Sequence, residues 1–342
     1  MVGFNRAALA FRAILNRMFC LPVLNYFDDY PIMVTEELAD VMDEAVKSVA
    51  RITGFRLKGG AKDKPFAGTF KVLGVKLDLS EVFSAGLVRV LNTPERCTAL
   101  IAQIGAALES NKMGAAEASQ LAGRLGFASG QLFGKAGASA LWHLRRRADG
   151  RGLMGKISAP LACALQFWRE NLREGTPKTM VFVHRLPPLL LFTDGFCDQE
   201  EGHVRAGYGG ILIDPASEFA EAFGELIPDS LVDSWRALGG YDQVVAQAEI
   251  LPTIVARMLW QRQLSGDPGR RIVNFIDNDS ARYGLLKGYS PTRSSAFLLG
   301  EFWRLEEKLQ VCSWFERVPT KSNCADGLAD SSSVHSKVCG GD

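Results

Sequence analysis

The sequence predicts an α/β protein of two parts, a helix-rich first part with a few short strands and a second part built on a mixed β-sheet. A chain of 342 residues with 47% hydrophobic and 23% charged residues can bury a sizeable core. From residue 186 the expected elements follow the order β-β-β-α-β-α-α-β-α, which is typical of a mixed sheet flanked by helices. The charge changes there too: residues 1–185 hold 25 Lys and Arg against 16 Asp and Glu, and residues 186–342 hold 14 against 22.

Composition and patterning argue against a secreted or membrane-spanning protein. The longest apolar run, Leu186–Phe192, contains two prolines and is far shorter than the ~18 residues of a membrane helix. Arg6, Arg12 and Arg17 interrupt the apolar residues of the first segment, which is unlike a secretory signal. Seven cysteines without a CxxC pair argue against a disulfide framework and a structural zinc site. We therefore expect an intracellular protein, cytoplasmic or nuclear, in a reducing compartment.

The first 150 residues are expected to be mostly helical. Residues 7–19 have helical apolar spacing that stops before Pro22. Residues 23–26 and 32–34 are expected to pair as a short hairpin. The remaining expected elements are a helix at 37–49 capped by Thr35, a basic loop at 58–64, a strand at 70–77 interrupted by Gly74, and helices over 93–147.

The second part is expected to begin after a helix at 162–172 and a linker at 173–178, which sets predicted domains at 1–150, 151–185 and 186–342. Its first three strands include a hairpin around the turn Asp214-Pro215-Ala216-Ser217. The expected strands are 189–192, 206–213, 218–226, 271–276 and 311–318, and the expected helices are 244–261, 280–286 and 294–309. Pro252 suggests that the helix carrying Glu249 begins near that glutamate, because an interior proline costs ~3 kcal/mol.

Four acidic residues of the second part stand where a metal site would need them. Asp194 follows an apolar strand run, Glu249 lies on a helix, Asp277 ends a strand and Asp326 follows the last strand. Mg²⁺ and Mn²⁺ prefer carboxylate oxygens, and two such ions can cleave a phosphodiester bond. The ordinary interpretation is that each is a turn or capping residue. Asp279 and Asp330 are competing ligands, and Asp277 is favoured because it directly ends its strand.

The segments around these residues carry a resemblance. Phe192-Thr193-Asp194-Gly195, Ala248-Glu249-Ile250, Ile276-Asp277-Asn278 and Val318–Leu328 resemble the ribonuclease H domain of retroelement polyproteins, closest to retrotransposons whose last block reads VPxxxNxADxLSR. The resemblance covers roughly residues 186–335. It implies a ribonuclease-H-like mixed five-stranded sheet, with Asp194, Glu249, Asp277 and Asp326 holding two Mg²⁺ or Mn²⁺ ions that cleave the RNA strand of an RNA–DNA hybrid.

Two departures from the family pattern lie in the last block. Ala329-Asp330 stands where a Ser-Arg pair is usual. Many relatives carry a histidine in the preceding loop, thought to assist product release, and this loop has Lys321 instead. The chief alternative is therefore a non-catalytic, nucleic-acid-binding remnant of a retrotransposon polyprotein. A nuclease or strand transferase acting on DNA is a weaker alternative.

An upstream segment resembles another part of the same polyproteins. Asn25-Tyr26-Phe27-Asp28-Asp29-Tyr30 looks like the YxDD hairpin of reverse transcriptases, and residues 93–147 resemble the helical thumb and connection. Polymerase chemistry in that family also needs an aspartate from an earlier palm strand, which this sequence lacks. Asp28 and Asp29 are thus interpreted as a vestigial polymerase metal site, and we expect no independent DNA synthesis. A solvated turn explains the pair equally well.

Basic residues are the predicted contacts to nucleic acid. The run Arg145-Arg146-Arg147 ends a predicted helix and would bind phosphates, although a solvated helix end is an equal alternative. Lys321 lies in the last block and is expected to approach the same substrate. The expected partner is an RNA–DNA hybrid or another nucleic acid, with no membrane.

Overall fold

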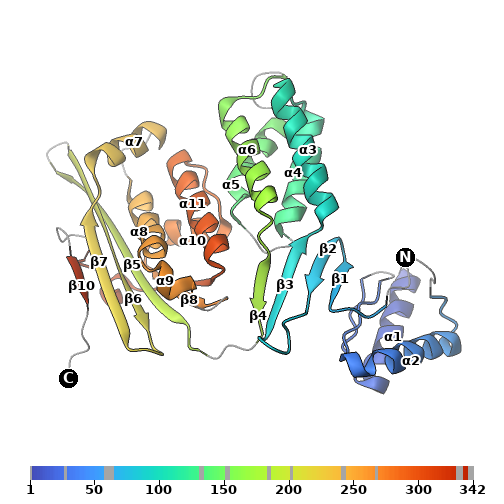
Figure 1. Ribbon diagram of the computed structural model, residues 1–342. Helices are drawn as coiled ribbons and strands as arrows, with labels where there is room; N and C mark the ends of the chain where they lie inside the picture. Colours follow the sequence, from blue (N-terminus) through green and yellow to red (C-terminus); the bar gives the residue numbers. More distant parts are fainter. Residues whose placement is uncertain are drawn as a thin grey trace. The chain divides into compact units, whose positions relative to one another are not determined.

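The computed structural model describes residues 2–26, 29–57, 65–130, 135–150, 155–182, 186–200, 203–239, 244–265, 269–328 and 334–337 (Figure 1). The chain divides into two compact units, Met1–Leu73 and Gly74–Asp342. The predicted boundaries at residues 150 and 185 both lie inside the second unit and remain predictions. None of the helices among the described residues is long and apolar enough to cross a membrane.

The first unit is built on two helices and a hairpin. Its elements are α1 (Val2–Phe19), η1 (Glu36–Leu38), α2 (Ala39–Thr53) and β1 (Thr69–Val72). Phe11 of α1 is fully buried and packs against the rings of Tyr30 and Phe55. Antiparallel bridges join Val23 to Ile32 and Tyr26 to Asp29, which confirms the predicted hairpin. The predicted helix at 37–49 is longer and begins with a 3-10 turn.

The strand predicted at 70–77 is two strands. β1 ends at Val72, and β2 (Val75–Asp78) begins after a two-residue turn. Leu73 and Gly74 both have positive φ, 49° and 78°. Two consecutive residues with positive φ make a tight turn of the chain, and glycine accepts this conformation without a steric cost. Gly74 therefore belongs to a turn between two strands and does not interrupt a single strand.

Four helices form a bundle at the start of the second unit, as predicted for residues 93–147 and 162–172. They are α3 (Pro94–Ser110), α4 (Ala115–Gly130), α5 (Ala138–Ala148) and α6 (Ala159–Glu174). Buried leucines from all four helices and Trp168 form one core. β2, β3 (Leu87–Asn92) and β4 (Lys178–Val181) are antiparallel neighbours. The linker predicted at 173–178 thus runs directly into a strand, because residues 178–181 pair with β3.

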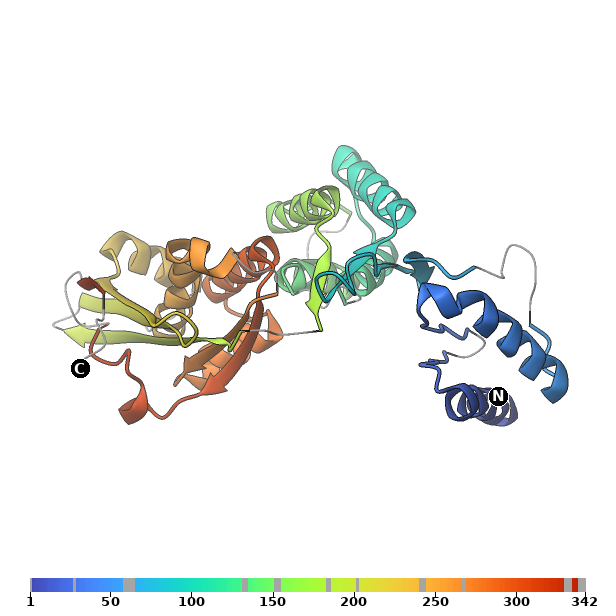
Figure 2. The same ribbon diagram turned by 60° about the horizontal axis from the view of Figure 1, so that its bottom comes forward.

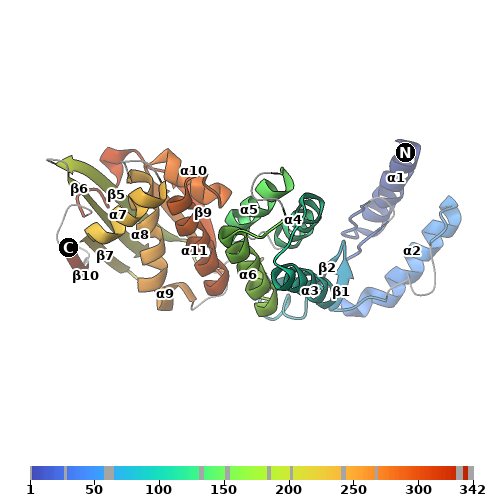
Figure 3. The same cartoon turned by 90° about the horizontal axis from the view of Figure 1, so that it is seen from above.

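The rest of the second unit is a mixed sheet with helices, which confirms the predicted fold class for this region (Figures 1, 2 and 3). The strand order is β10-β7-β6-β5-β8-β9. β6 is antiparallel to β5 and β7, whereas β5, β8 and β9 are parallel. The strands are β5 (Leu189–Glu200), β6 (His203–Asp214), β7 (Phe219–Leu226), β8 (Arg271–Ile276), β9 (Cys312–Arg317) and β10 (Val334–Lys337). The helices are α7 (Asp229–Gly239), α8 (Val245–Leu259), α9 (Gln261–Ser265), α10 (Asp279–Lys287) and α11 (Arg293–Leu309).

Several elements differ from the sequence-based expectation. α7 and β10 were not predicted, and β5 runs eight residues beyond the predicted 189–192 because it pairs with β6 as far as Glu200. The helix expected after the last strand is replaced, in the described residues, by the 3-10 turn η3 (Thr320–Ser322) and a turn through Leu328. Helix α8 begins at Val245, ahead of Glu249, and holds Pro252 in its interior. The prediction that this helix starts near Glu249 was wrong.

A buried arginine connects α8 and α11 to the strands β8 and β9. Arg257 of α8 donates from Nε to Glu306 of α11 at 2.8 Å, and from Nη2 to Asn274 of β8 and Ser313 of β9 at 2.9 and 2.8 Å. Both charged side chains are almost completely buried. A buried charge is tolerated only when it is paired and hydrogen-bonded, and here both conditions are met. The network fixes β8 and β9 against the two helices.

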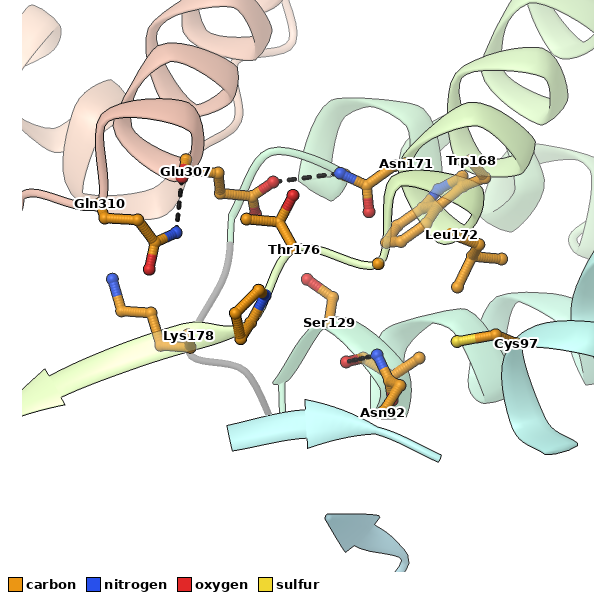
Figure 4. Close-up of a pocket in the computed structure, with 14 residues that line it drawn as sticks. Asn92, Cys97, Ser129, Trp168, Asn171, Leu172, Thr176, Lys178, Glu307 and Gln310 are labelled. Carbon is orange, nitrogen blue, oxygen red and sulfur yellow. Dashed lines mark hydrogen bonds between the residues drawn. The ribbon is translucent and has the colours of Figure 1, made fainter. Parts of the chain in front are cut away.

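The bundle and the sheet region are joined by polar contacts on two sides. Lys135 and Ser139 donate to backbone carbonyls at the end of α10 and the start of α11. On the other side lies a small cavity of about 60 Å³, where Asn171 donates to Glu307 at 3.1 Å (Figure 4). The backbone N–H of Thr179 donates to Gln310 nearby. These contacts hold α5, α6 and β4 against the two helices that follow β8.

Candidate metal centre

Three of the four predicted carboxylates meet beside the interior strands β5 and β8 of the mixed sheet. Asp194 of β5, Glu249 of α8 and Asp277 after β8 each offer a carboxylate oxygen, and these oxygens lie within 4.8 Å of one another. Asp194 and Glu249 are buried, at 8% and 4% exposure, and Asp277 is half-buried. Three acidic groups from three different elements therefore share one small volume.

The strand register explains why the two aspartates meet. β5 and β8 run parallel, and Phe192 is paired with Phe275. Their rings stack with centroids 4.4 Å apart. Asp194 and Asp277 each follow their phenylalanine by two residues, and side chains two apart point to the same face of a strand. The two carboxylates are thus neighbours at the point where β8 ends beside the middle of β5.

A glycine brings the glutamate to the same place. A Cβ on Gly195 would lie 2.6 Å from the Glu249 backbone nitrogen and closer still to the carbonyl of Ala248. Only glycine therefore allows β5 to approach the backbone of α8 at this point. Pro252 has no N–H to donate to the Ala248 carbonyl four residues before it, so this carbonyl faces Gly195 without its usual helical partner. Pro252 and Gly195 therefore act at the same contact between α8 and β5, where the Ala248 carbonyl meets the glycine.

Burial and mutual repulsion shift the proton affinity of the cluster. Burial raises the pKa of Glu249 to about 9, and the negative charges of Asp277 and Asp194 contribute. Burial also raises the pKa of Asp194 to about 6, together with the charges of Asp277 and Asp326. Removing water and adding like charges both disfavour the ionised form of a carboxylate. The free chain therefore keeps protons in this cluster at neutral pH.

Two buried oxygens of the cluster have no hydrogen-bond partner. They are Oε2 of Glu249 and Oδ1 of Asp277. An unpaired buried acceptor costs roughly 1–3 kcal/mol, and more when the group is charged. A divalent cation removes this cost, because Mg²⁺ and Mn²⁺ bind carboxylate oxygens and neutralise their repulsion. The donor set and the orphaned oxygens fit such an ion.

Asp326 lies beside this cluster rather than in it. Its side chain is exposed, yet its charge contributes to the raised pKa of Asp194. The segment is held by Asn323, which is buried and donates from Nδ2 to the carbonyl of Thr193 at 3.0 Å. The backbone N–H of Asp326 donates to the Asn323 carbonyl at 3.0 Å. Asn323 therefore ties the last block to the residue before Asp194.

The competing acidic residues are placed differently. Asp279 is exposed and forms ion pairs with Arg282 at 2.9 Å and Arg317 at 3.5 Å. Asp330 lies outside the described residues. Of the two aspartates near the end of β8, the structure thus places Asp277 in the cluster and Asp279 on the surface.

The predicted nucleic-acid contacts are only partly available at the surface. Arg145, Arg146 and Lys321 are exposed. Arg147 is buried at 8% exposure, and its Nε donates to the carbonyl of Met113 at 2.8 Å. Its side chain holds α5 against the loop before α4, so the prediction that it binds phosphates needs correction. The apolar face of α5 turns this third arginine of the run inward.

The vestigial polymerase site is mostly outside the described residues. Asp28 lies outside them, and Asp29 is exposed. Asp29 exchanges backbone hydrogen bonds with Tyr26 at 2.9 and 3.0 Å. Its backbone thus closes the tip of the hairpin, while its carboxylate faces solvent.

Sequence reasoning missed two residues that position the site. Gly195 and Asn323 both stand inside the quoted motifs, but only the carboxylates were singled out there. A glycine directly after a strand aspartate was the signal available for the close approach to α8. Asn323 gave no separate signal, since its contact with Thr193 joins segments 130 residues apart.

Comparison with known proteins identifies similar solved structures. No protein-family model matches the chain, and no curated protein matches it. Ribonuclease H1 from the halophilic archaeon Halobacterium salinarum NRC-1 is 17% identical, with a TM-score of 0.31, over 42% of this chain and 96% of that one. LC11-RNase H1 in complex with an RNA/DNA hybrid is 16% identical, with a TM-score of 0.33, over 42% and 95%. LC9-RNase H1, a type 1 enzyme with the type 2 active-site motif, is 13% identical, with a TM-score of 0.33, over 45% and 80%.

Proposed function

We propose that residues 186–335 hydrolyse the RNA strand of an RNA–DNA hybrid in a reaction that needs Mg²⁺ or Mn²⁺. The observation that carries this proposal is the cluster of Asp194, Glu249 and Asp277, with two buried oxygens that lack a partner. The cluster supports metal-dependent phosphodiester hydrolysis. The choice of the RNA strand rests on the motifs that resemble retroelement ribonuclease H domains.

The chain's own residues would hold the ions and manage protons. Asp194 would bind from β5, Asp277 from the end of β8 and Glu249 from α8, with Asp326 approaching from the last block. When bound, divalent ions activate water and stabilise the leaving oxygen of the phosphodiester. Glu249 has a pKa of about 9 in the free chain, so it must release its proton to become a ligand at neutral pH. Binding is therefore expected to release protons and to strengthen as the pH rises.

A strand-specific cleavage assay tests the proposal. Purified chain is incubated with a hybrid labelled on either strand, in Mg²⁺, in Mn²⁺ or in chelator. We expect cutting of the RNA strand alone, only with metal, and its loss in Asp194→Asn. Asp198→Asn is the matched control, because Asp198 lies on the same strand but is exposed. Absence of cleavage by the wild-type chain with hybrid binding retained favours the non-catalytic remnant instead.

We further propose that the chain derives from a retroelement polyprotein and that its first unit does not polymerise DNA. The retroelement origin rests on the YxDD-like hairpin and the helices over 93–147, and the expected lack of polymerase activity rests on Asp29, whose side chain is exposed at the hairpin. A primer-extension assay with Mg²⁺ and with Mn²⁺ tests the second statement. Extension by wild type that is lost in Asp29→Asn would contradict it.

A further inference from the structure

A second pocket lies between the helical bundle and the end of α10. Its volume is about 420 Å³, and it is lined from α4 and α5 on one side and from residues 287–289 on the other. Lys135, Arg145 and Lys287 supply three positive charges to its wall, and Trp142 and Tyr289 supply two aromatic rings. None of the described residues that line it is acidic. The pocket therefore offers charge and stacking surface to an anionic, aromatic ligand.

The positive charge extends around the rim of this pocket. Arg146 lies over the Trp142 ring, with its guanidinium carbon 4.7 Å from the ring centroid. Burial lowers the pKa of His143 on the same helix, and the charges of Arg146 and Arg293 lower it further. The charges of Arg146 and Arg293 therefore both lie close to His143. Arg145 and Lys287 are exposed, so their charges are free to meet phosphate groups.

The helix α10 connects the pocket to the carboxylate cluster. It begins two residues after Asp277 and ends at Lys287. Along the way the Arg282 guanidinium and the Lys287 amine lie 4.7 and 5.9 Å from the ring centroid of Tyr283. Tyr283 is half exposed. After the ion pair of Asp279 with Arg282 at the start of α10, the aromatic Tyr283 and the cationic Lys287 thus lead along the helix to the pocket.

The length of α10 sets the spacing. Its nine residues span about 13 Å at 1.5 Å per residue. One strand of a duplex carries a phosphate about every 3.4 Å, so this length matches roughly four phosphates. A strand cut at the cluster would therefore bring its fourth or fifth phosphate to Lys287.

The two walls of the pocket are held together. Lys135 donates to the carbonyl of Leu286 at the end of α10. Ser139 of α5 donates to the carbonyls of Gly288 and Ala296, at 3.3 and 3.1 Å. A Cβ on Gly288 would come within 2.8 Å of the Lys135 Cβ, so this close packing requires glycine there. These contacts therefore fix the two walls of the pocket relative to one another within the second unit.

We propose that this pocket binds a strand of nucleic acid that extends from the carboxylate cluster, with Arg145 and Lys287 on phosphates and Trp142 stacked on a base. Alternating cations and aromatic rings are the combination that binds a sugar-phosphate backbone and base faces together. The site belongs jointly to the helical bundle and the sheet region. It deepens the proposed nuclease function, because it assigns part of substrate binding to the bundle.

Binding is measured on the full chain in chelator, so that cleavage has no influence. The probe is an RNA–DNA hybrid of about 20 base pairs, roughly 70 Å long. We expect Arg145→Ala combined with Lys287→Ala to weaken binding by about tenfold or more. The slope of log affinity against log salt should fall by about 2, one for each phosphate contact. Lys308→Ala is the matched control, since it removes an exposed charge at the far end of α11.

Stacking is tested separately with conservative variants. Trp142→Leu keeps the apolar volume without a ring and should weaken binding at least about fivefold, whereas Trp142→Phe should restore much of it. Melting temperatures check that all variants are folded. Competition by inorganic polyphosphate or polyglutamate as strong as that by single-stranded RNA, per charge, would contradict a nucleic-acid strand. Unchanged affinity in the Arg145 and Lys287 double variant would overturn the site.

The cleavage reaction separates this proposal from the proposed function. In Mg²⁺ the double variant should cleave the hybrid of about 20 base pairs with a raised KM and an unchanged kcat. A hybrid of about 6 base pairs is too short to occupy the cluster centrally and reach the pocket, so its cleavage should be unaffected. Loss of kcat on both substrates would contradict a binding role. Absence of cleavage by wild type would contradict the nuclease and leave the result in chelator valid.

Discussion

The chain contains two acidic motifs that resemble metal sites, and the structure places them in different surroundings. In the second unit, Asp194, Glu249 and Asp277 come from two strands and a helix and converge within 4.8 Å. In the first unit, Asp29 lies at the tip of a hairpin and is exposed. Crowded, buried carboxyl groups must either keep protons or bind a cation, whereas a solvated turn aspartate needs neither. The burial of the carboxylate, more than the motif, indicates the metal site.

The largest expected difference between the two motifs is in cleavage. Glu249→Gln should lower the rate of RNA cleavage by about 10³-fold or more, because the ions stabilise several kcal/mol of charge in the transition state. Asp29→Asn should leave the rate within about twofold. Single-turnover kinetics on a labelled hybrid measure both. Equal losses in the two variants would show that the hairpin takes part in the same reaction.

The close approach of β5 and α8 is the next expected effect. Gly195→Ala places a Cβ against the Ala248 carbonyl, and the resulting backbone shift should cost about 1–3 kcal/mol of unfolding free energy. Cleavage should fall with it, since Asp194 and Glu249 then move apart. Gly123→Ala in α4 is the control, because no atom lies within 4 Å of the added methyl. Urea denaturation and cleavage rates measure the pair, and wild-type behaviour of Gly195→Ala would refute the packing argument.

The anchor of the last block should show a smaller effect. Asn323→Ala leaves the buried carbonyl of Thr193 without its donor and should cost about 1–3 kcal/mol. Asp326 is then released from its place beside Asp194, so we expect a higher Mg²⁺ concentration for half-maximal cleavage. A metal titration of the cleavage rate checks this. An unchanged metal requirement would mean that Asp326 does not contribute to ion binding.

The pH dependence of stability gives the smallest and most specific effect. Glu249 holds its proton to about pH 9 in the folded chain but only to its ordinary pKa of 4.5 when unfolded. Between these values the folded state binds more protons, so the free energy of unfolding in chelator should fall as the pH rises, by at most about 1.4 kcal/mol per pH unit. Above pH 6 Asp194 is already ionised, whereas Glu249 still holds its proton. Glu249→Gln should therefore flatten the slope of unfolding free energy against pH in this range.

Thermal unfolding in chelator from pH 5 to pH 9 measures this dependence. Added Mg²⁺ should stabilise the wild-type chain more at pH 9 than at pH 6, because fewer protons must be displaced. Asp29→Asn serves as the control and should follow the wild-type curve. A stability that rises with pH in chelator would contradict the buried, protonated cluster.

Most of the sheet region was predictable because its signals are local. The apolar residues of β8 and the turn between β6 and β7 define those elements from sequence alone. The start of helix α8 was predicted wrongly because Pro252 was considered only for the free energy that an interior proline costs a helix. The contact of Gly195 with Ala248 accounts for the carbonyl that this proline leaves unpaired, and it joins residues far apart in sequence.

The candidate site was predictable in its residue types but not in its geometry. The order of Asp194, Glu249 and Asp277 along the chain indicated a cluster, and the strand register determined that two of them face one another. The pocket between α5 and α10 was not predictable, because Trp142 and Lys287 stand 145 positions apart and their motifs are unremarkable when taken singly. The burial of Arg147 was not predictable either, because it follows two exposed arginines in the same basic run.

The central claim is that Asp194, Glu249 and Asp277 form a divalent metal site, and Mn²⁺ located in a crystal tests it most directly. The anomalous signal of Mn²⁺ in a soaked crystal shows where the ion binds. We expect a peak roughly 2.0–2.6 Å from carboxylate oxygens of all three residues, lost in Asp194→Asn. Carboxyl groups that hydrogen-bond to each other, with no peak between them at saturating Mn²⁺, would contradict it.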